Sequence, residues 1–349
     1  MIFFYVILFV IVLASLKYKG TNSEYISVQQ TNVIKGVFIW LVFMGHIMPY
    51  IADVIPLESF IDRAGPGVVR ILQQLVVVPF LFYSGYGVTN SIKNKGQSYV
   101  DSIPKKRVLN TMLNFGVAVS FFILLNWLLD IPMNLKQILL SFVCWDSIGN
   151  SNWYILTICI CYLSSYFSYK LLGYTRSSLI ANVVFLFVYI LIISKFKGSW
   201  WYDTCLAYSA GCIFCFYKER VEDIIGRNYW LCTLIIGGLF AVSYLASVKI
   251  YVVQPLFMNI CSIFFSFSLV LLSLKFQLRS KILEWSGKNL FSLYIYQRIP
   301  MILFSTICGG YLVTEWRYVY VVTCAVVSIV IVHLYKYITI KFISVNTNK

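Results

Sequence analysis

Charged residues are scarce in this sequence. They make up 12% of its 349 residues, about half of the share that a soluble domain uses to cover its surface. Hydrophobic residues account for 60%, and no polar stretch is long enough to form a soluble domain. The composition therefore excludes an ordinary soluble protein. It predicts an all-α fold, a polytopic transmembrane helical bundle of about 10–11 spans, with residues 1–349 forming a single integral-membrane domain.

Acidic residues and histidines are also few. The chain has 13 Asp and Glu against 28 Lys and Arg, two His, and a net charge of +15. The basic residues are spread over many loops, which argues against a nucleic-acid-binding patch. Most of the ten cysteines lie in apolar runs. The one C-x-x-C pair, Cys212 and Cys215, has no second pair or neighbouring His, so we predict no metal site.

Eleven apolar segments approach the roughly 20 residues that a helix needs to cross a bilayer. The first could be a signal peptide, but it has no basic residues before its apolar run, and we expect an N-terminal helix there. The segment 136–145 is too short to cross and is expected to be interfacial or re-entrant. The eleven candidates lie near residues 2–16, 33–51, 69–91, 108–130, 152–172, 178–194, 203–217, 229–247, 252–274, 288–310 and 317–338.

The positions of the basic residues predict how these spans are oriented. Most Lys and Arg residues fall in the odd-numbered loops and in the C-terminal tail. Basic loops are retained on the cytoplasmic side of a membrane. We therefore expect the C-terminus in the cytoplasm, the N-terminus outside, and an outer loop near residues 52–68.

Ionisable groups at membrane depth are costly and often mark function. His46 lies well inside the segment 33–51, and Lys35 is eleven residues earlier on nearly the same helix face, about 16 Å away along the axis. Arg298 lies near the middle of the segment 288–310. The simpler interpretation is a His that bonds a neighbouring helix, with Lys35 extending to the interface. The alternative is a reaction centre.

Several short motifs resemble, in the same order along the chain, those of the membrane acyltransferase-3 family. Lys35-Gly36 followed by Gly45-His46 is similar to its first signature, and the resemblance extends over a core of about 33–340, with helix 2–16 as an addition. Two positions depart from the family pattern, since Lys35 stands in place of Arg and Gln297 in place of His. The other similar stretches are residues 80–88, 102–110, 153–154, 200–211 and 287–297.

The resemblance implies an O-acyltransferase of the bacterial plasma membrane, without a bound cofactor. Such an enzyme moves an acyl group, usually acetyl, from cytoplasmic acyl-CoA to a hydroxyl of a cell-surface or lipid-linked polysaccharide. His46 would be the general base or a transient acyl carrier, and Arg298 would polarise the thioester carbonyl. Acetyl-CoA or another acyl-CoA, the glycan and the lipid bilayer are the expected partners.

The donor is expected to meet basic and small polar residues on the cytoplasmic side. Lys288 would add to the positive end of the helix dipole at the start of its span. The basic residues could equally serve only to set the topology, and the small residues around Ser84 only to pack helices closely. The predicted donor-binding residues are Lys35, Ser84, Tyr86, Lys105, Lys106, Arg107 and Lys288.

On the outer side, Trp153, Tyr154, Trp201 and Asp203 are the predicted acceptor-binding residues, the rings by stacking on sugars and Asp203 by bonding hydroxyls. Asp203 is also a candidate to orient His46. Interfacial aromatic belts are the alternative explanation of these rings. A transporter or flippase for a glycan or its precursor is the main alternative function, although no inverted repeat is evident.

Overall fold

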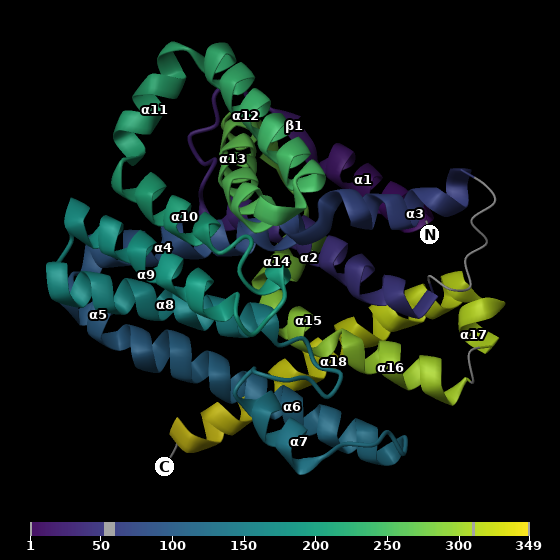
Figure 1. Ribbon diagram of the computed structural model, residues 1–349. Helices are drawn as coiled ribbons and strands as arrows, with labels where there is room; N and C mark the ends of the chain where they lie inside the picture. The colour runs from purple at the N-terminus through teal and green to yellow at the C-terminus, as the bar shows by residue number, and fades with distance from the viewer. Residues whose placement is uncertain (1, 52–59, 309–310, 348–349) are drawn as a thin grey trace.

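The computed structural model describes residues 2–51, 60–308 and 311–347, which are almost entirely helical (Figure 1). The helices are α1 (Ile2–Ser15), α2 (Val28–Ile51), α3 (Phe60–Leu72), η2 (Gln73–Val77), α4 (Val78–Lys95), α5 (Gln97–Ile103), η3 (Pro104–Leu109), α6 (Asn110–Leu128), α7 (Leu135–Phe142), α8 (Trp153–Leu172), α9 (Arg176–Ile193), η4 (Ser199–Trp201), α10 (Leu206–Phe216), α11 (Lys218–Arg227), α12 (Tyr229–Lys249), η5 (Tyr251–Val253), α13 (Gln254–Lys275), α14 (Lys281–Lys288), α15 (Leu290–Tyr296), α16 (Arg298–Ile307), α17 (Tyr311–Thr314) and α18 (Arg317–Thr347). One small sheet pairs β1 (Leu16–Tyr18) antiparallel with β2 (Phe276–Leu278).

The predicted all-α membrane fold is confirmed. Within the described residues, nine helical stretches are long and apolar enough to cross a membrane, and they match nine of the eleven predicted segments. The other two are helices as well, but α1 has 14 residues and α10 has 11. At about 1.5 Å per residue they rise only about 21 and 17 Å, so neither crosses about 30 Å of hydrocarbon by itself.

Two regions differ from the expected boundaries. Residues 60–68 of the predicted outer loop belong to α3, whereas residues 52–59 lie outside the described part of the chain. The segment expected as one helix over 288–310 is divided, because α14 ends at Lys288, α15 ends at Tyr296 and α16 begins at Arg298. The short helix α7 agrees with the expectation that 136–145 does not cross the membrane.

The loops that we predicted on the cytoplasmic side meet at one end of the helices. The Tyr25 hydroxyl donates to Glu222 at 2.9 Å, and burial, with this carboxylate next, raises the pKa of Tyr25. Lys93 and Glu219 lie 3.6 Å apart, which joins the end of α4 to α11. Strand β1, in the first of these loops, pairs with β2 in another. The grouping of these loops is therefore as predicted from the charges.

Two helix pairs pack backbone against backbone. An added Cβ at Gly36 of α2 would overlap the carbonyl of Leu283, and one at Gly287 of α14 would overlap Asn32. The same reciprocal contact joins α4 to α10, where Gly85 faces Tyr208 and Gly211 faces Phe82. Small residues allow this close approach in membranes. The contacts fix α2, which carries Lys35 and His46, and α4, which carries Ser84 and Tyr86.

Candidate active site

A polar cavity of 530 Å³ lies among the first turns of α2, the second half of α4 and the turn η3. Lys35, Ser84, Tyr86 and Arg107 all line it, so the fold brings together four of the seven residues predicted to bind the donor. They come from three segments that are distant in the sequence. The sequence did not single out the other polar groups of the wall, which belong to Ser27, Thr31, Tyr83, Asn90, Ser91 and Tyr162.

Local structure explains why these side chains turn inward. Gly85 faces the backbone of α10. Its neighbours Ser84 and Tyr86 therefore lie on either side of this helix contact, and both line the cavity. The ring of Tyr86 packs against Phe214, with centroids 5.9 Å apart. Arg107 lies in the π-helical turn η3 and donates from Nε to the Tyr99 hydroxyl at 3.1 Å. The contact fixes the stem of the guanidinium and leaves its outer nitrogens for a ligand.

The cavity carries two positive charges without a carboxylate on its wall. Lys35 and Arg107 are close enough for their charges to act on each other. Among the ion pairs of the described residues neither of them has a partner. Two like charges held together in a partly enclosed polar space favour an anionic ligand with several oxygens. Phosphate groups have this character, and Arg offers them a planar pair of donors.

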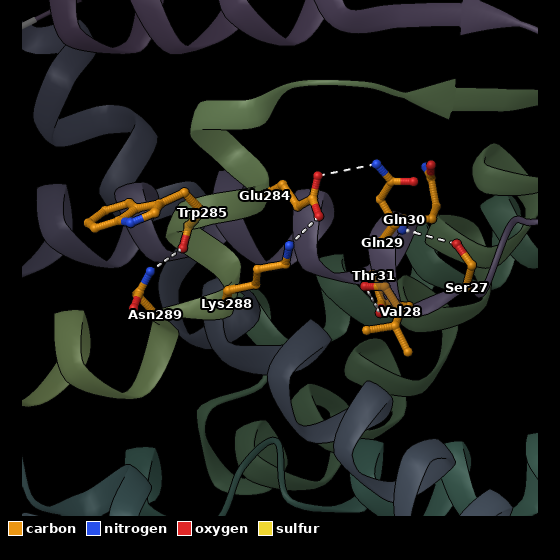
Figure 2. A network of polar contacts seen from close by, with 9 residues as sticks. All are labelled: Ser27, Val28, Gln29, Gln30, Thr31, Glu284, Trp285, Lys288 and Asn289. Carbon is orange, nitrogen blue, oxygen red and sulfur yellow. Dashed lines mark hydrogen bonds and ion pairs between the residues drawn. The ribbon is translucent and has the colours of Figure 1, made fainter. Parts of the chain in front are cut away.

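The remaining predicted donor residues lie elsewhere. Lys105 and Lys106 are exposed on η3 and do not line the cavity. Lys288 is the last residue of α14, and the spanning stretch begins two residues later at Leu290, so Lys288 lies just before the span that it was expected to open. Its ammonium lies 2.6 Å from Glu284, which also accepts from Gln29 (Figure 2). The hydrogen bond from Lys288 holds the pKa of Glu284 below its usual value.

His46 lies in a second cluster, further along α2. Its Nδ1 is 2.9 Å from Nε2 of Gln297, and its ring centroid is 5.7 Å from that of Tyr294. Arg298 follows directly and is close enough for its charge to act on the imidazole. The Tyr294 hydroxyl and the Arg298 Nε are buried and have no hydrogen-bond partner among the described residues. Buried donors without partners are costly, which suggests that they bond a ligand here.

Two prolines disturb the helices that carry His46 and Arg298. Pro49 lies inside α2, and Pro300 lies in the first turn of α16. A proline has no N–H for the carbonyl four residues earlier and its ring clashes with it, which affects Gly45 in one helix and Tyr296 in the other. The second case explains why the predicted span 288–310 breaks at Gln297. Gln297 lies at this break, and its amide contacts His46.

Three tyrosines, Tyr162, Tyr154 and Tyr294, form a tyrosine line between the two clusters. Tyr162 lines the cavity and lies under the Arg107 guanidinium, 5.9 Å from ring to carbon. Tyr154 is on the same helix, α8, and its ring is 5.2 Å from that of Tyr294. Tyr294 in turn contacts His46. Tyr162 and Tyr154 are eight residues apart on α8, about 12 Å along its axis. The helix α8, and not a continuous series of ring contacts, therefore joins the cavity to the imidazole.

The predicted acceptor residues form two groups. Tyr154 is buried and belongs to the tyrosine line, and Trp153 packs edge-on against it with ring centroids 6.0 Å apart. Trp201 is buried, and the ammonium of Lys197 lies 4.8 Å from its ring centroid. Asp203 is buried before the start of α10, and burial raises its pKa well above the usual range. The side chain against Nδ1 of His46 is that of Gln297, so the orienting position proposed for Asp203 is occupied by another residue.

The family model described as the acyltransferase domain of the acyltransferase-3 family matches residues 28–335. The chain belongs to this family. A search of the curated proteins found no match, and neither did a search of the solved structures. The acyltransferase domain therefore includes both clusters and leaves α1 outside the matched region.

In this acyltransferase, sequence reasoning missed Tyr162 and Tyr294 as parts of the site and did not assign Gln297 a contact. Tyrosines are numerous, 26 in all, so no single one stands out by type. A usable signal existed for Gln297, because it occupies a motif position where the family was expected to have a His. Its partner His46 is 251 residues away, and only the fold shows that they meet.

Proposed function

We propose that this acyltransferase moves an acyl group, acetyl in the first instance, from cytoplasmic acyl-CoA to a hydroxyl of a cell-surface or lipid-linked polysaccharide. The cavity with Lys35 and Arg107 would hold the phosphates of CoA. The pantetheine arm would extend past Ser84 and Tyr86 and along the tyrosine line to His46. The acceptor would approach from the opposite end of the helices, and the protein would lie in a bacterial plasma membrane with its C-terminus in the cytoplasm.

In the general-base route, a ring nitrogen of His46 removes the proton of the acceptor hydroxyl. The hydroxyl oxygen attacks the thioester carbonyl, a C–O bond forms and the C–S bond breaks. His46 then returns the proton to the leaving sulfur, which departs as the CoA thiol. Arg298 would stabilise the charge that develops on the carbonyl oxygen. In the covalent route, His46 itself would carry the acyl group before it passes to the acceptor.

The observation that carries this proposal is an arrangement on and around α2. Lys35 and Arg107 lie in a cavity without an ion-pair partner among the described residues, and the imidazole of His46 lies further along the same helix. A site for phosphate alone would not need His46 at its far end, and a structural histidine would not need buried donors without partners beside it. Lys35 and His46 lie on one helix, α2, and their spacing supports assigning them to two depths of one site.

The direct test uses inside-out membrane vesicles that contain the protein and radiolabelled acetyl-CoA. We expect label to enter a glycan or glycolipid fraction, and vesicles prepared without the protein serve as the control. If no glycan or lipid fraction gains label above the control, with the protein shown to be inserted and folded, the proposed donor or acceptor class is wrong.

A further inference from the structure

Gln297 holds His46 by one defined ring atom. Its amide Nε2 lies 2.9 Å from Nδ1 of His46 and 3.4 Å from the carbonyl oxygen of Tyr294. The side chain is buried, with 1% of the residue exposed. An amide nitrogen can only donate, so Nδ1 must accept in this arrangement. A neutral imidazole then carries its proton on Nε2, because the bond made at one ring nitrogen decides which nitrogen is protonated.

The surroundings favour this orientation of the amide. With the nitrogen toward Tyr294 and His46, the amide donates to two acceptors. If the amide turned over, its oxygen would face the Tyr294 carbonyl oxygen, and two acceptors would then lie side by side without a proton between them. The turned amide could still bond His46, but only by accepting from Nδ1–H. The orientation of the Gln297 amide therefore selects between the two tautomers of His46, and the imidazole ring does not have to move.

We propose that Gln297 is a positioning residue that fixes the His46 ring and sets which of its nitrogens carries the proton. In the resting arrangement Nε2 bears the proton and can donate to a thioester carbonyl or to a leaving sulfur. Accepting a proton at Nε2 from a hydroxyl requires the other tautomer, in which the Gln297 oxygen accepts from Nδ1–H. The assignment of the resting tautomer depends on geometry alone, whereas its effect on transfer rests on the proposed function.

The test is the nitrogen NMR spectrum of protein labelled with ¹⁵N only in its histidine rings, in lipid nanodiscs. A His333→Gln background leaves His46 as the single signal, since the chain has two histidines. His333 stacks on Trp285, away from His46. We expect a protonated Nε2 and an unprotonated Nδ1 at neutral pH. A His46 that carries its proton on Nδ1 in the resting protein would overturn the assignment.

Two substitutions separate positioning from packing. Gln297→Glu presents only acceptor atoms when ionised, and we expect the proton to move to Nδ1. Gln297→Leu replaces the amide with an apolar side chain of similar size that makes no hydrogen bond, and we expect a mixture of the two tautomers. If the ¹⁵N signals of His46 are unchanged in both variants, Gln297 does not set the tautomer. If Gln297→Leu does not fold, Gln297→Met takes its place.

The kinetic consequence is measured separately. Loss of the hydrogen-bond partner of a metal-ligating histidine typically costs about 10–100-fold, and we expect Gln297→Leu to lower kcat by a similar factor. The KM for acetyl-CoA should stay within about twofold, because Gln297 does not line the donor cavity. A normal kcat in Gln297→Leu would contradict the positioning role. Failure of all variants and the wild type to transfer acetyl would count against the proposed function, while the NMR pattern still decides the role of Gln297.

Discussion

At the scale of single residues, the donor cavity separates one basic side chain from its neighbours in the sequence. Arg107 lines the cavity, whereas Lys105 and Lys106 do not. All three carry the same charge and lie on the same side of the membrane, so composition and topology cannot distinguish them. The difference comes from the direction in which the turn η3 presents each side chain. Substrate binding should follow that direction and not the number of charges.

The variant Arg107→Gln should therefore raise the KM for acetyl-CoA by about tenfold, the lower end of what a hydrogen bond to a charged group contributes. Lys106→Gln should change it less than about twofold, as expected for an exposed charge that is screened by salt. Lys136→Gln on α7 is the matched control, because it removes the same charge at a distant exposed position. Equal effects of Arg107→Gln and Lys106→Gln on KM would show that the cavity is not the donor site.

Arg298 presents a different kind of residue-scale test. Its Nε is buried without a partner among the described residues, next to His46. If its charge stabilises the carbonyl oxygen only in the transition state, Arg298→Gln should lower kcat by about 10²–10³-fold and leave the KM for acetyl-CoA nearly unchanged. The measurement is a steady-state transfer assay at several acetyl-CoA concentrations. A raised KM with normal kcat would instead make Arg298 part of the binding site for the donor.

At the scale of helices, close backbone contacts hold the two helices of the site. Gly211 of α10 faces the backbone of α4 near Ser84 and Tyr86, and no side chain fits between them. Gly237 of α12, in contrast, has open space around its position. Both are glycines within apolar helices, so the sequence alone gives no reason to treat them differently. Their surroundings predict opposite effects of the same substitution.

Gly211→Ala should lower the free energy of unfolding by about 1–3 kcal/mol, the usual cost of overpacking, because the helix backbones must move apart. Gly237→Ala should be neutral or stabilising by up to about 1 kcal/mol, since Ala is the better helix former. The measurement is thermal unfolding of both purified variants in the same detergent. If both variants unfold at the same temperature, the tight contact between α4 and α10 is not present in the protein.

The elements also show how far sequence reasoning extends. Within the described residues each predicted apolar segment is largely helical, because a helix satisfies its own backbone in lipid whatever surrounds it. The break at Gln297 was missed although Pro300 was visible, since a proline within a span can also be accommodated as a kink. The shared face of Lys35 and His46 followed from the helix period. Their separate surroundings, the cavity around one and Gln297 around the other, depend on contacts between distant segments and could not be predicted.

At the scale of the whole molecule, the charge pattern grouped the loops by side. The contacts of Tyr25 with Glu222 and of Lys93 with Glu219 join loops that were placed on the same side from their basic residues alone. At the opposite end, the ammonium of Lys197 bonds the backbone of Trp145. These contacts show which loops share one end of the helices, at either side of the membrane. The orientation of the molecule across the membrane is tested by labelling the two ends.

We expect the helix end that carries α5 to face the cytoplasm and the end that carries α7 to face outward. In a variant without native cysteines, Ser98→Cys on α5 should react with a membrane-impermeant maleimide only in inside-out vesicles. Lys136→Cys on α7 should react only in intact cells or right-side-out vesicles. Both positions are exposed, so each acts as the control for the other. Labelling of Ser98→Cys from the outside would reverse the orientation and place the donor cavity on the wrong side for cytoplasmic acyl-CoA.

The most direct test of the central claim is acyl transfer by His46→Ala beside His333→Ala, in vesicles with matched protein content. His46 contacts Gln297 and Tyr294 in the proposed reaction centre, whereas His333 stacks on Trp285. We predict that His46→Ala loses about 10²–10⁴-fold in rate, as expected for loss of a general base, and that His333→Ala keeps its activity. Transfer by a folded His46→Ala protein within a few-fold of the wild-type rate would contradict the account.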